Sequence, residues 1–234
     1  MYRNFMLPGI RSVTASLVLF VATGSHAALT PVLPGPGHEP GLIGVNGIID
    51  DRFGLENLVR IDDSIDQYWR NDGHIVVKTL AKWAGFGQSF GYINASGDFS
   101  QLLNVSNKWS RPAGSFRAED SGGLFRFGLD PGGSPLWSSA PSTNSDALDH
   151  MVTWQITASR NRGLIGAYIT AWEDLAGGGD RDYNDLVLLI KGDASLHTVA
   201  TAEVLAAVPV PAALWLFASG LLGLGVFARR SNTL

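Results

Sequence analysis

The sequence contains no cysteine, which excludes disulfides, thiolate-bound zinc, iron–sulfur clusters and thiol catalysis. It also has no long stretch with the 3.6-residue apolar period of an amphipathic helix. About 180 residues lie between its two apolar ends, which is enough for one domain with a substantial core. Stability must therefore come from burial of that core, with a bound metal as a further source.

The N-terminal segment has the three parts of a secretion signal. Arg3 and Arg11 form a basic start without acidic residues, and an apolar run follows over residues 13–22. Ser25 and Ala27 place small residues where a signal peptidase reads them. A run of about ten residues is too short to span a membrane as a helix. We expect a signal peptide over residues 1–27, cut after Ala27; an uncleaved anchor is the alternative.

The C-terminal segment is also apolar. Residues 212–228 read AALWLFASGLLGLGVFA, close to the lower length limit for a transmembrane helix, and Arg229 and Arg230 follow directly. Basic residues stay on the cytoplasmic side, so this helix would place its C-terminus inside. A buried core helix is the alternative, but such a helix would show a polar face and this segment has none.

Charge is distributed unevenly between the ends and the body. The whole chain has 17 basic and 21 acidic side chains, and the two ends hold four arginines and no acid. The body therefore keeps 13 basic against 21 acidic side chains, a net charge of −8. Such a body is a poor partner for nucleic acid, and it is compatible with cation binding and with solubility outside the cell.

The body has the pattern of an all-β domain. Turn residues recur every 8 to 15 positions or so, between short β-branched or alternating runs. This favours a β-sandwich or jelly-roll-like domain over residues 48–192. Before it we expect a Pro/Gly-rich linker or irregular edge over 28–47, and after it a linker over 193–207. The expected strands are 75–81, 88–93, 116–127 with a turn at 121–123, 149–158, 164–172 and 186–191.

One acidic loop carries most of the chemistry. Residues 172–185 read WEDLAGGGDRDYND and contain six side chains with ligating oxygens: Glu173, Asp174, Asp180, Asp182, Asn184 and Asp185. Crowding them is costly without a counter-charge. Ca²⁺ supplies one, because it takes about six to eight oxygen ligands in flexible geometry. Three successive glycines let the backbone fold closely around such an ion.

The loop is not an EF-hand. Asp180, Asp182 and Asn184 copy the first three ligand positions, but Asp185 replaces the required glycine. Lys191 stands where the bidentate glutamate would be, and a strand follows instead of a helix. Two alternatives remain open. Arg181 could pair with Glu173 or Asp174, or the loop could be a solvated turn held by Asx hydrogen bonds.

Two stretches resemble known families. WEDLAGGGDRDYNDLVLLI is similar to the FEDLxGGGDxDYND signature of domain-of-unknown-function family 4114, with a DHMV strand upstream at residues 149–152; the resemblance covers about 136–191. It implies a β-rich secreted domain with a calcium site, and no reaction. Residues 208–230, VPVPAALWLFASGLLGLGVFARR, resemble a PEP-CTERM sorting tail, with Val210 where the namesake motif has Glu.

The tail resemblance implies a route to the surface. Such tails are cut by exosortase, a membrane protease of Gram-negative bacteria that make exopolysaccharide. The partners expected are signal peptidase, exosortase, the inner membrane before processing, and exopolysaccharide, with no nucleic acid. The favoured hypothesis is a non-enzymatic, calcium-binding structural or adhesive protein of the cell surface or extracellular matrix.

Three other chemistries compete with that hypothesis. A carbohydrate-binding module would use exposed Trp83, Trp109 or Trp137 as sugar platforms. A glycoside hydrolase would use Glu173, Asp174 or Asp185 as its carboxylate pair. Residues 87–91 fit the Gly-x-Ser-x-Gly pattern of a nucleophile elbow, although no helical period follows. His150 is either an additional metal ligand or a satisfied core residue.

Overall fold

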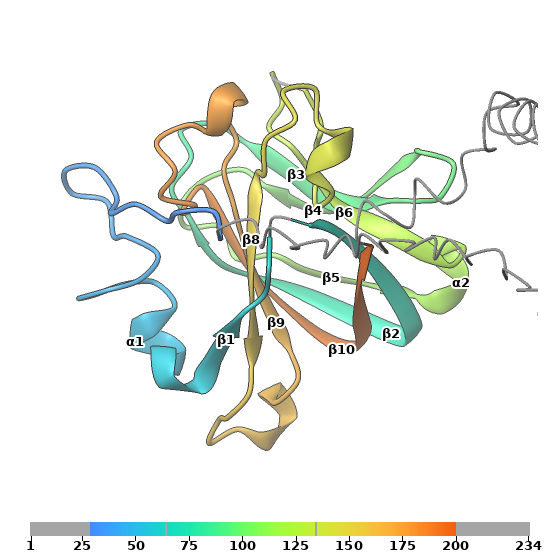
Figure 1. Cartoon of the computed structure of the whole chain (residues 1–234), viewed down its shortest axis with the longest axis horizontal. Coiled ribbons are helices and arrows are strands. Elements are labelled where there is room, and N and C mark those ends of the chain that lie inside the picture. Colours follow the sequence, from blue (N-terminus) through green and yellow to red (C-terminus); the bar gives the residue numbers. More distant parts are fainter. Residues whose placement is uncertain (1–28, 64, 134, 200–234) are drawn as a thin grey trace, which may run out of the picture.

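The computed structural model describes residues 29–63, 65–133 and 135–199 (Figure 1). The expected signal peptide, sorting tail and transmembrane helix 212–228 lie outside these residues. Within the described ranges, no helix is long and apolar enough to cross a membrane. The strands are β1 Leu58–Arg60, β2 Asp66–Lys82, β3 Gln88–Ile93, β4 Phe99–Val105, β5 Ala113–Arg117, β6 Leu124–Asp130, β7 Trp137–Ser138, β8 Met151–Ile156, β9 Tyr168–Trp172 and β10 Leu186–Val199.

Within residues 29–63, 65–133 and 135–199, helical structure is confined to short turns. These are α1 Asp50–Phe53, α2 Ala118–Ser121 and the 3₁₀ segments η1 Leu55–Asn57, η2 Pro141–Thr143, η3 Arg162–Leu164 and η4 Ala176–Gly178. All strand pairs are antiparallel, in the order β1-β8-β9-β10-β2-β6-β3-β4, with β5 beside β2 and β7 beside β6. The all-β prediction is therefore confirmed.

Strands β8 and β9 and residues 186–190 of β10 are largely buried on both faces. Alternate residues of a strand point to opposite faces, and β10 shows the result. Leu186, Leu188 and Ile190 enter the main core, whereas Val187 and Leu189 enter a second core on the other face. This two-sided burial explains why the strand reads as a continuous apolar run rather than an alternating one.

The main core is largely aromatic and receives side chains from both halves of the sheet. Trp69 of β2 makes an edge contact with Phe127 of β6, at a centroid distance of 5.1 Å. Phe90 of β3 meets Trp172 of β9 in the same way at 5.7 Å. The portion containing β3, β4 and β6 thus packs across the portion containing β9 and β10. Large rings fill this interior without any disulfide.

The second core is closed by the chain that precedes the strands. Leu42 and Ile49 are fully buried, and Ile48 nearly so, against β8, β9 and β10. We call residues 29–49 the N-terminal strap. It contains no strand, and it runs over the face of the sheet (blue in Figure 1). The residues expected to form a linker or irregular edge therefore cover part of the domain.

Strand β10 is longer than the sequence suggests. It pairs with β2 from Leu186–Lys82 to Val199–Asp66, with register shifts after Val187 and Gly192. The 17-residue β2 offers an edge along this whole length, so pairing continues into residues expected to form a linker. Strand β4 has no counterpart among the expected strands, because its run FSQLLNV is only weakly alternating.

The acidic loop and two other connecting segments lie at one end of the sheet. Leu186 pairs with both Lys82 and Trp172, and Trp172 also pairs with Met151. The segments 83–87, 139–150 and 173–185 therefore leave the sheet at the same end. Figure 1 shows the orange turn between β9 and β10 there, beside the start of β8.

Candidate metal centre

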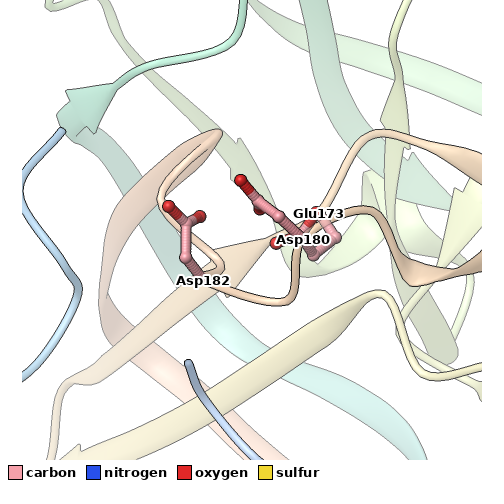
Figure 2. A group of neighbouring side chains, drawn as sticks. All are labelled: Glu173, Asp180 and Asp182. Carbon is pink, nitrogen blue, oxygen red and sulfur yellow. The ribbon is translucent and has the colours of Figure 1, made fainter. Parts of the chain in front are cut away.

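Three carboxylates of the acidic loop converge. Glu173, Asp180 and Asp182 each offer an oxygen, and these atoms all lie within 4.8 Å of one another (Figure 2). Glu173 directly follows β9, while the two aspartates come from the far side of the glycine turn. Glu173 and Asp182 are buried, and Asp180 is exposed. The set is made of hard oxygen donors, the chemistry that a cation such as Ca²⁺ requires.

The glycine turn makes this convergence possible. Gly177, Gly178 and Gly179 all have positive φ, at 80°, 80° and 49°. Gly179 has φ 49° and ψ −137°, a backbone conformation that favours glycine, and a Cβ there would also overlap the carboxylate of Glu173. Outside the loop, the Asp146 carboxylate accepts a hydrogen bond from the Gly177 N–H at 2.9 Å and holds the turn in place.

The return to the sheet is strained and internally hydrogen-bonded. Arg181 and Tyr183 have positive φ of 62° and 54°, which is unusual for non-glycine residues. The Tyr183 N–H donates to Glu173 Oε1 at 2.8 Å, and the Asn184 N–H donates to Asp182 Oδ1 at 3.0 Å. The second bond is the Asx type that the solvated-turn alternative invokes. However, Glu173 and Asp182 are each only 1% exposed, so the turn is not solvated at these two acids.

Burial and mutual repulsion raise the pKa of two acids of this cluster. Burial raises the pKa of Glu173 to about 9, and the charges of Asp185, Asp180 and Asp182 add to the shift. Burial likewise raises the pKa of Asp182 to about 6, with further repulsion from Asp180 and Glu39. A cation entering the cluster would displace protons from these acids.

The N-terminal strap lies against the cluster. The Leu33 N–H donates to the Arg181 carbonyl at 2.8 Å, and Asn184 Nδ2 donates to the Pro40 carbonyl at 3.2 Å. Asn184 Nδ2 also faces Asp182 and lies 3.5 Å from Glu39 Oε2. Glu39 is thus a further carboxylate beside the site. No sequence signal marks it, because about 140 residues separate it from the loop.

Asp174 and Asp185 form a separate pair. The Asp174 N–H donates to Asp185 Oδ2 at 3.0 Å, and Gln88 Nε2 donates to Asp174 Oδ2 at 2.7 Å. Burial raises the pKa of Asp185 to about 8, and the charge of Asp174 adds to it. Burial lowers the pKa of Lys82, while the charges of Asp174 and Asp185 oppose that shift. Lys82 is therefore an internal cation beside this pair.

The six expected ligands thus fall into two groups. Glu173, Asp180 and Asp182 meet at one point, with Asn184 hydrogen-bonded to Asp182. Asp174 and Asp185 are held together beside Lys82 and Gln88. Arg181 forms no salt bridge with Glu173 or Asp174 in the described part of the chain, and its side chain is exposed.

His150 is a fully buried and satisfied residue. Its Nδ1 lies 3.1 Å from the Glu173 carbonyl, and its Nε2 lies 3.0 Å from Asp146 Oδ2. Its ring stacks on Trp137 at a centroid distance of 3.7 Å. Trp137 is also fully buried and donates its indole N–H to the Asp174 carbonyl at 2.8 Å. The expectation that Trp137 is an exposed sugar platform is therefore wrong.

Ser89 does not sit in a nucleophile elbow. It is the second residue of β3, which continues to Ile93 and pairs on both sides with β4 and β6. A nucleophile elbow needs a sharp turn from strand to helix around the serine. The Gly-x-Ser-x-Gly pattern here is a strand interrupted by glycines, and Gly91 allows the backbone of β4 to approach closely.

Comparison with known proteins supports the expected identity of the body. The family model for the Domain of unknown function (DUF4114) matches residues 87–193, which contain the acidic loop. No curated protein matches the chain significantly. A solved mannose-binding lectin of Ralstonia solanacearum aligns at 15% identity and a TM-score of 0.35, covering 58% of this chain and 97% of the lectin. A similarity this low carries no argument about ligands. From residue 87 to 193, the body is therefore similar to the DUF4114 domain.

Proposed function

We propose that this chain is an exported, non-enzymatic surface protein whose β domain binds Ca²⁺ in the loop between β9 and β10. The observation that carries the proposal is the convergence of the Glu173, Asp180 and Asp182 carboxylates. These three would hold the ion. Glu39 and Asn184 stand close enough to the cluster to adjust the site.

Calcium fits this donor set better than smaller or softer cations. The candidate ligands are all oxygens, which disfavours metals that prefer thiolate or imidazole. Mg²⁺ demands near-ideal octahedral geometry, whereas Ca²⁺ accepts irregular sets from a flexible loop. Three glycines with positive φ give the loop an irregular path of this kind.

The bound ion would act structurally. Glu173 directly follows β9, and Asp180 and Asp182 lead into β10 through a strained turn. The N-terminal strap is hydrogen-bonded to this turn at the Arg181 carbonyl. An ion would neutralise the acids that otherwise retain protons or repel one another. It would thereby stabilise the loop and the strap together, since a ligand that binds only the folded state adds to its stability.

The arrangement favours a binding role over glycoside hydrolysis. A hydrolase places two carboxyls on either side of a sugar, about 5 to 10 Å apart. Here three acids crowd around one point, and Asp174 and Asp185 are hydrogen-bonded to each other. Such crowding suits a cation.

In this proposal, the two end segments of the chain determine where the protein is located. A signal peptide over residues 1–27 would export the chain, and the tail over residues 208–230 would hold it in the inner membrane until exosortase cuts it. The acidic, cysteine-free body is compatible with that route. A structural or adhesive role at the cell surface or in the extracellular matrix follows.

A thermal melt of the full chain in calcium and in EDTA tests the proposal. At a free calcium concentration of about one hundred times Kd, the ion would add about 2.7 kcal/mol. For a domain of this size that is a rise in Tm of roughly 5 to 10 °C. Asp180→Asn should abolish the rise, while the exposed control Asp51→Asn should keep it. Identical melting temperatures in calcium and EDTA would overturn the metal proposal.

A further inference from the structure

An exposed aromatic and cationic surface lies at the same end as the acidic loop. Trp109, between β4 and β5, is 80% exposed. Lys108 Nζ lies 5.2 Å from the ring centroid of Trp109 and 5.6 Å from that of Trp83. Arg111 lies two residues after Trp109 in the sequence. Trp83 is half-buried and packs against the second core. We call Trp83, Lys108, Trp109 and Arg111 the Trp–Lys ridge.

The ridge is held rigidly despite its exposure. Asn107 Oδ1 accepts hydrogen bonds from the N–H groups of Trp109 and Ser110 at 3.0 and 3.1 Å. Arg111 Nη1 donates to the carbonyls of Lys108 and Ser110 at 2.6 and 2.8 Å. The loop is therefore ordered before any ligand arrives, which reduces the entropic cost of binding.

The cations of the ridge lack acidic partners. No carboxylate among the described residues forms a salt bridge with Lys108 or Arg111, although the body is acidic overall. Partial burial lowers the pKa of Arg111, and the positive charge of Arg52 lowers it further. Lys108 thus lies over an exposed indole, with Arg111 in the same loop. An anion from outside the chain would complement them.

We propose that the Trp–Lys ridge binds an anionic polysaccharide. The apolar face of a sugar ring would stack on the Trp109 indole, and carboxylates of uronic acid residues would pair with Lys108 and Arg111. A rigid aromatic anchor beside a guanidinium is typical of surfaces that bind tightly. This inference goes beyond the calcium site, because none of its residues is a candidate metal ligand.

A polysaccharide suits the ridge better than a membrane surface. Membrane-binding segments present several apolar side chains beside their basic ones. Trp109 instead projects among polar neighbours, namely Ser106, Asn107 and Ser110. Trp109, the exposed indole of the ridge, lies beside the Lys108 ammonium and matches one sugar ring with an acidic substituent.

Calorimetry of the full chain with polygalacturonate tests the inference, with neutral dextran and phosphatidylglycerol vesicles as the competing ligands. We expect binding to polygalacturonate that weakens with salt, and none to dextran. Trp109→Ala should weaken binding by about tenfold or more. Lys108→Ala should weaken it several-fold and reduce its salt dependence. The exposed controls Ile165→Ala and Lys191→Ala should bind like the wild type.

Three results would overturn the inference: equal binding of Trp109→Ala and wild type, equal binding to dextran, or binding to the vesicles alone. The titration is run in EDTA as well as in calcium, because the polymer itself binds calcium. Binding that persists in EDTA and depends on Trp109 supports the ridge even if the melt shows no calcium effect. Binding that needs calcium and ignores Trp109 would assign the polymer to the acidic loop instead.

Discussion

Each of the two groups of carboxylates between β9 and β10 contains buried acids, yet the groups differ in the source of positive charge. Asp174 and Asp185 lie under the influence of Lys82, a cation that the chain itself supplies. The charges that act on the pKa values of Glu173 and Asp182 are instead those of other acids, among them Asp180, Asp185 and Glu39. The first group thus has a cation of the chain beside it, whereas the second would gain one only by binding the ion that we propose.

Glu173→Gln should have the largest effect, and only when calcium is present. At neutral pH the buried Glu173 is mostly protonated without a cation, because its pKa is about 9, so Gln imitates that form. We expect melting in EDTA to be nearly unchanged. The stabilisation by calcium, about 2.7 kcal/mol at one hundred times Kd, should disappear. A Gln variant that calcium still stabilises fully would remove Glu173 from the site.

Lys82→Met should lower stability equally with and without calcium, in contrast to Glu173→Gln. Methionine keeps the length of the side chain but removes the charge beside Asp174 and Asp185 and the hydrogen bond from Nζ to the Ala84 carbonyl. We expect a loss of about 2 kcal/mol in the free energy of unfolding. Urea denaturation should report the same loss in calcium and in EDTA. A loss that calcium repairs would mean that the two groups share one counter-charge.

The pH dependence should separate the free and calcium-bound forms. The folded-state pKa of Glu173 is raised from 4.5 to about 9, so the folded protein holds more protons than the unfolded one between these values. Stability in EDTA should therefore fall as pH rises from about 5 to 8. Calcium replaces the protons, so the difference in Tm between calcium and EDTA should grow over the same range. Melts at several pH values that show a constant difference would count against proton displacement.

Glu39→Gln should have the smallest effect. Its carboxylate adds negative charge beside Asp182 from the N-terminal strap, at the edge of the cluster. We expect calcium affinity to fall by a few-fold, measured by titration with a fluorescent chelator as competitor. The exposed Glu119→Gln carries the same charge change far from the loop and serves as the matched control.

Much of this organisation can be predicted from short stretches of sequence. The run LVLLI predicts a buried strand because it is continuously apolar, and its residues enter both cores. Asp180, Asp182 and the glycines predict a tight oxygen-rich loop. Such features depend on residues that are neighbours in the chain, so local patterns suffice to find them.

Contacts between distant segments could not be predicted in this way. Glu39 reaches the cluster because the strap folds across the sheet, and its Pro/Gly-rich sequence gives no sign of that path. Lys82 approaches Asp174 and Asp185 only through the register of β2 with β10. Trp137 tolerates complete burial because the Asp174 carbonyl accepts its indole N–H, a partner 37 positions away.

The most direct test of the central claim is calorimetric titration of Ca²⁺ into the metal-free full chain, with Glu173→Gln and Lys82→Met measured in parallel. The convergence of three carboxylates predicts one ion per chain for the wild type, no binding for Glu173→Gln, and binding close to wild type for Lys82→Met. Absence of binding by the wild type, or equal binding by Glu173→Gln, would contradict the claim that this cluster is completed by a cation from outside.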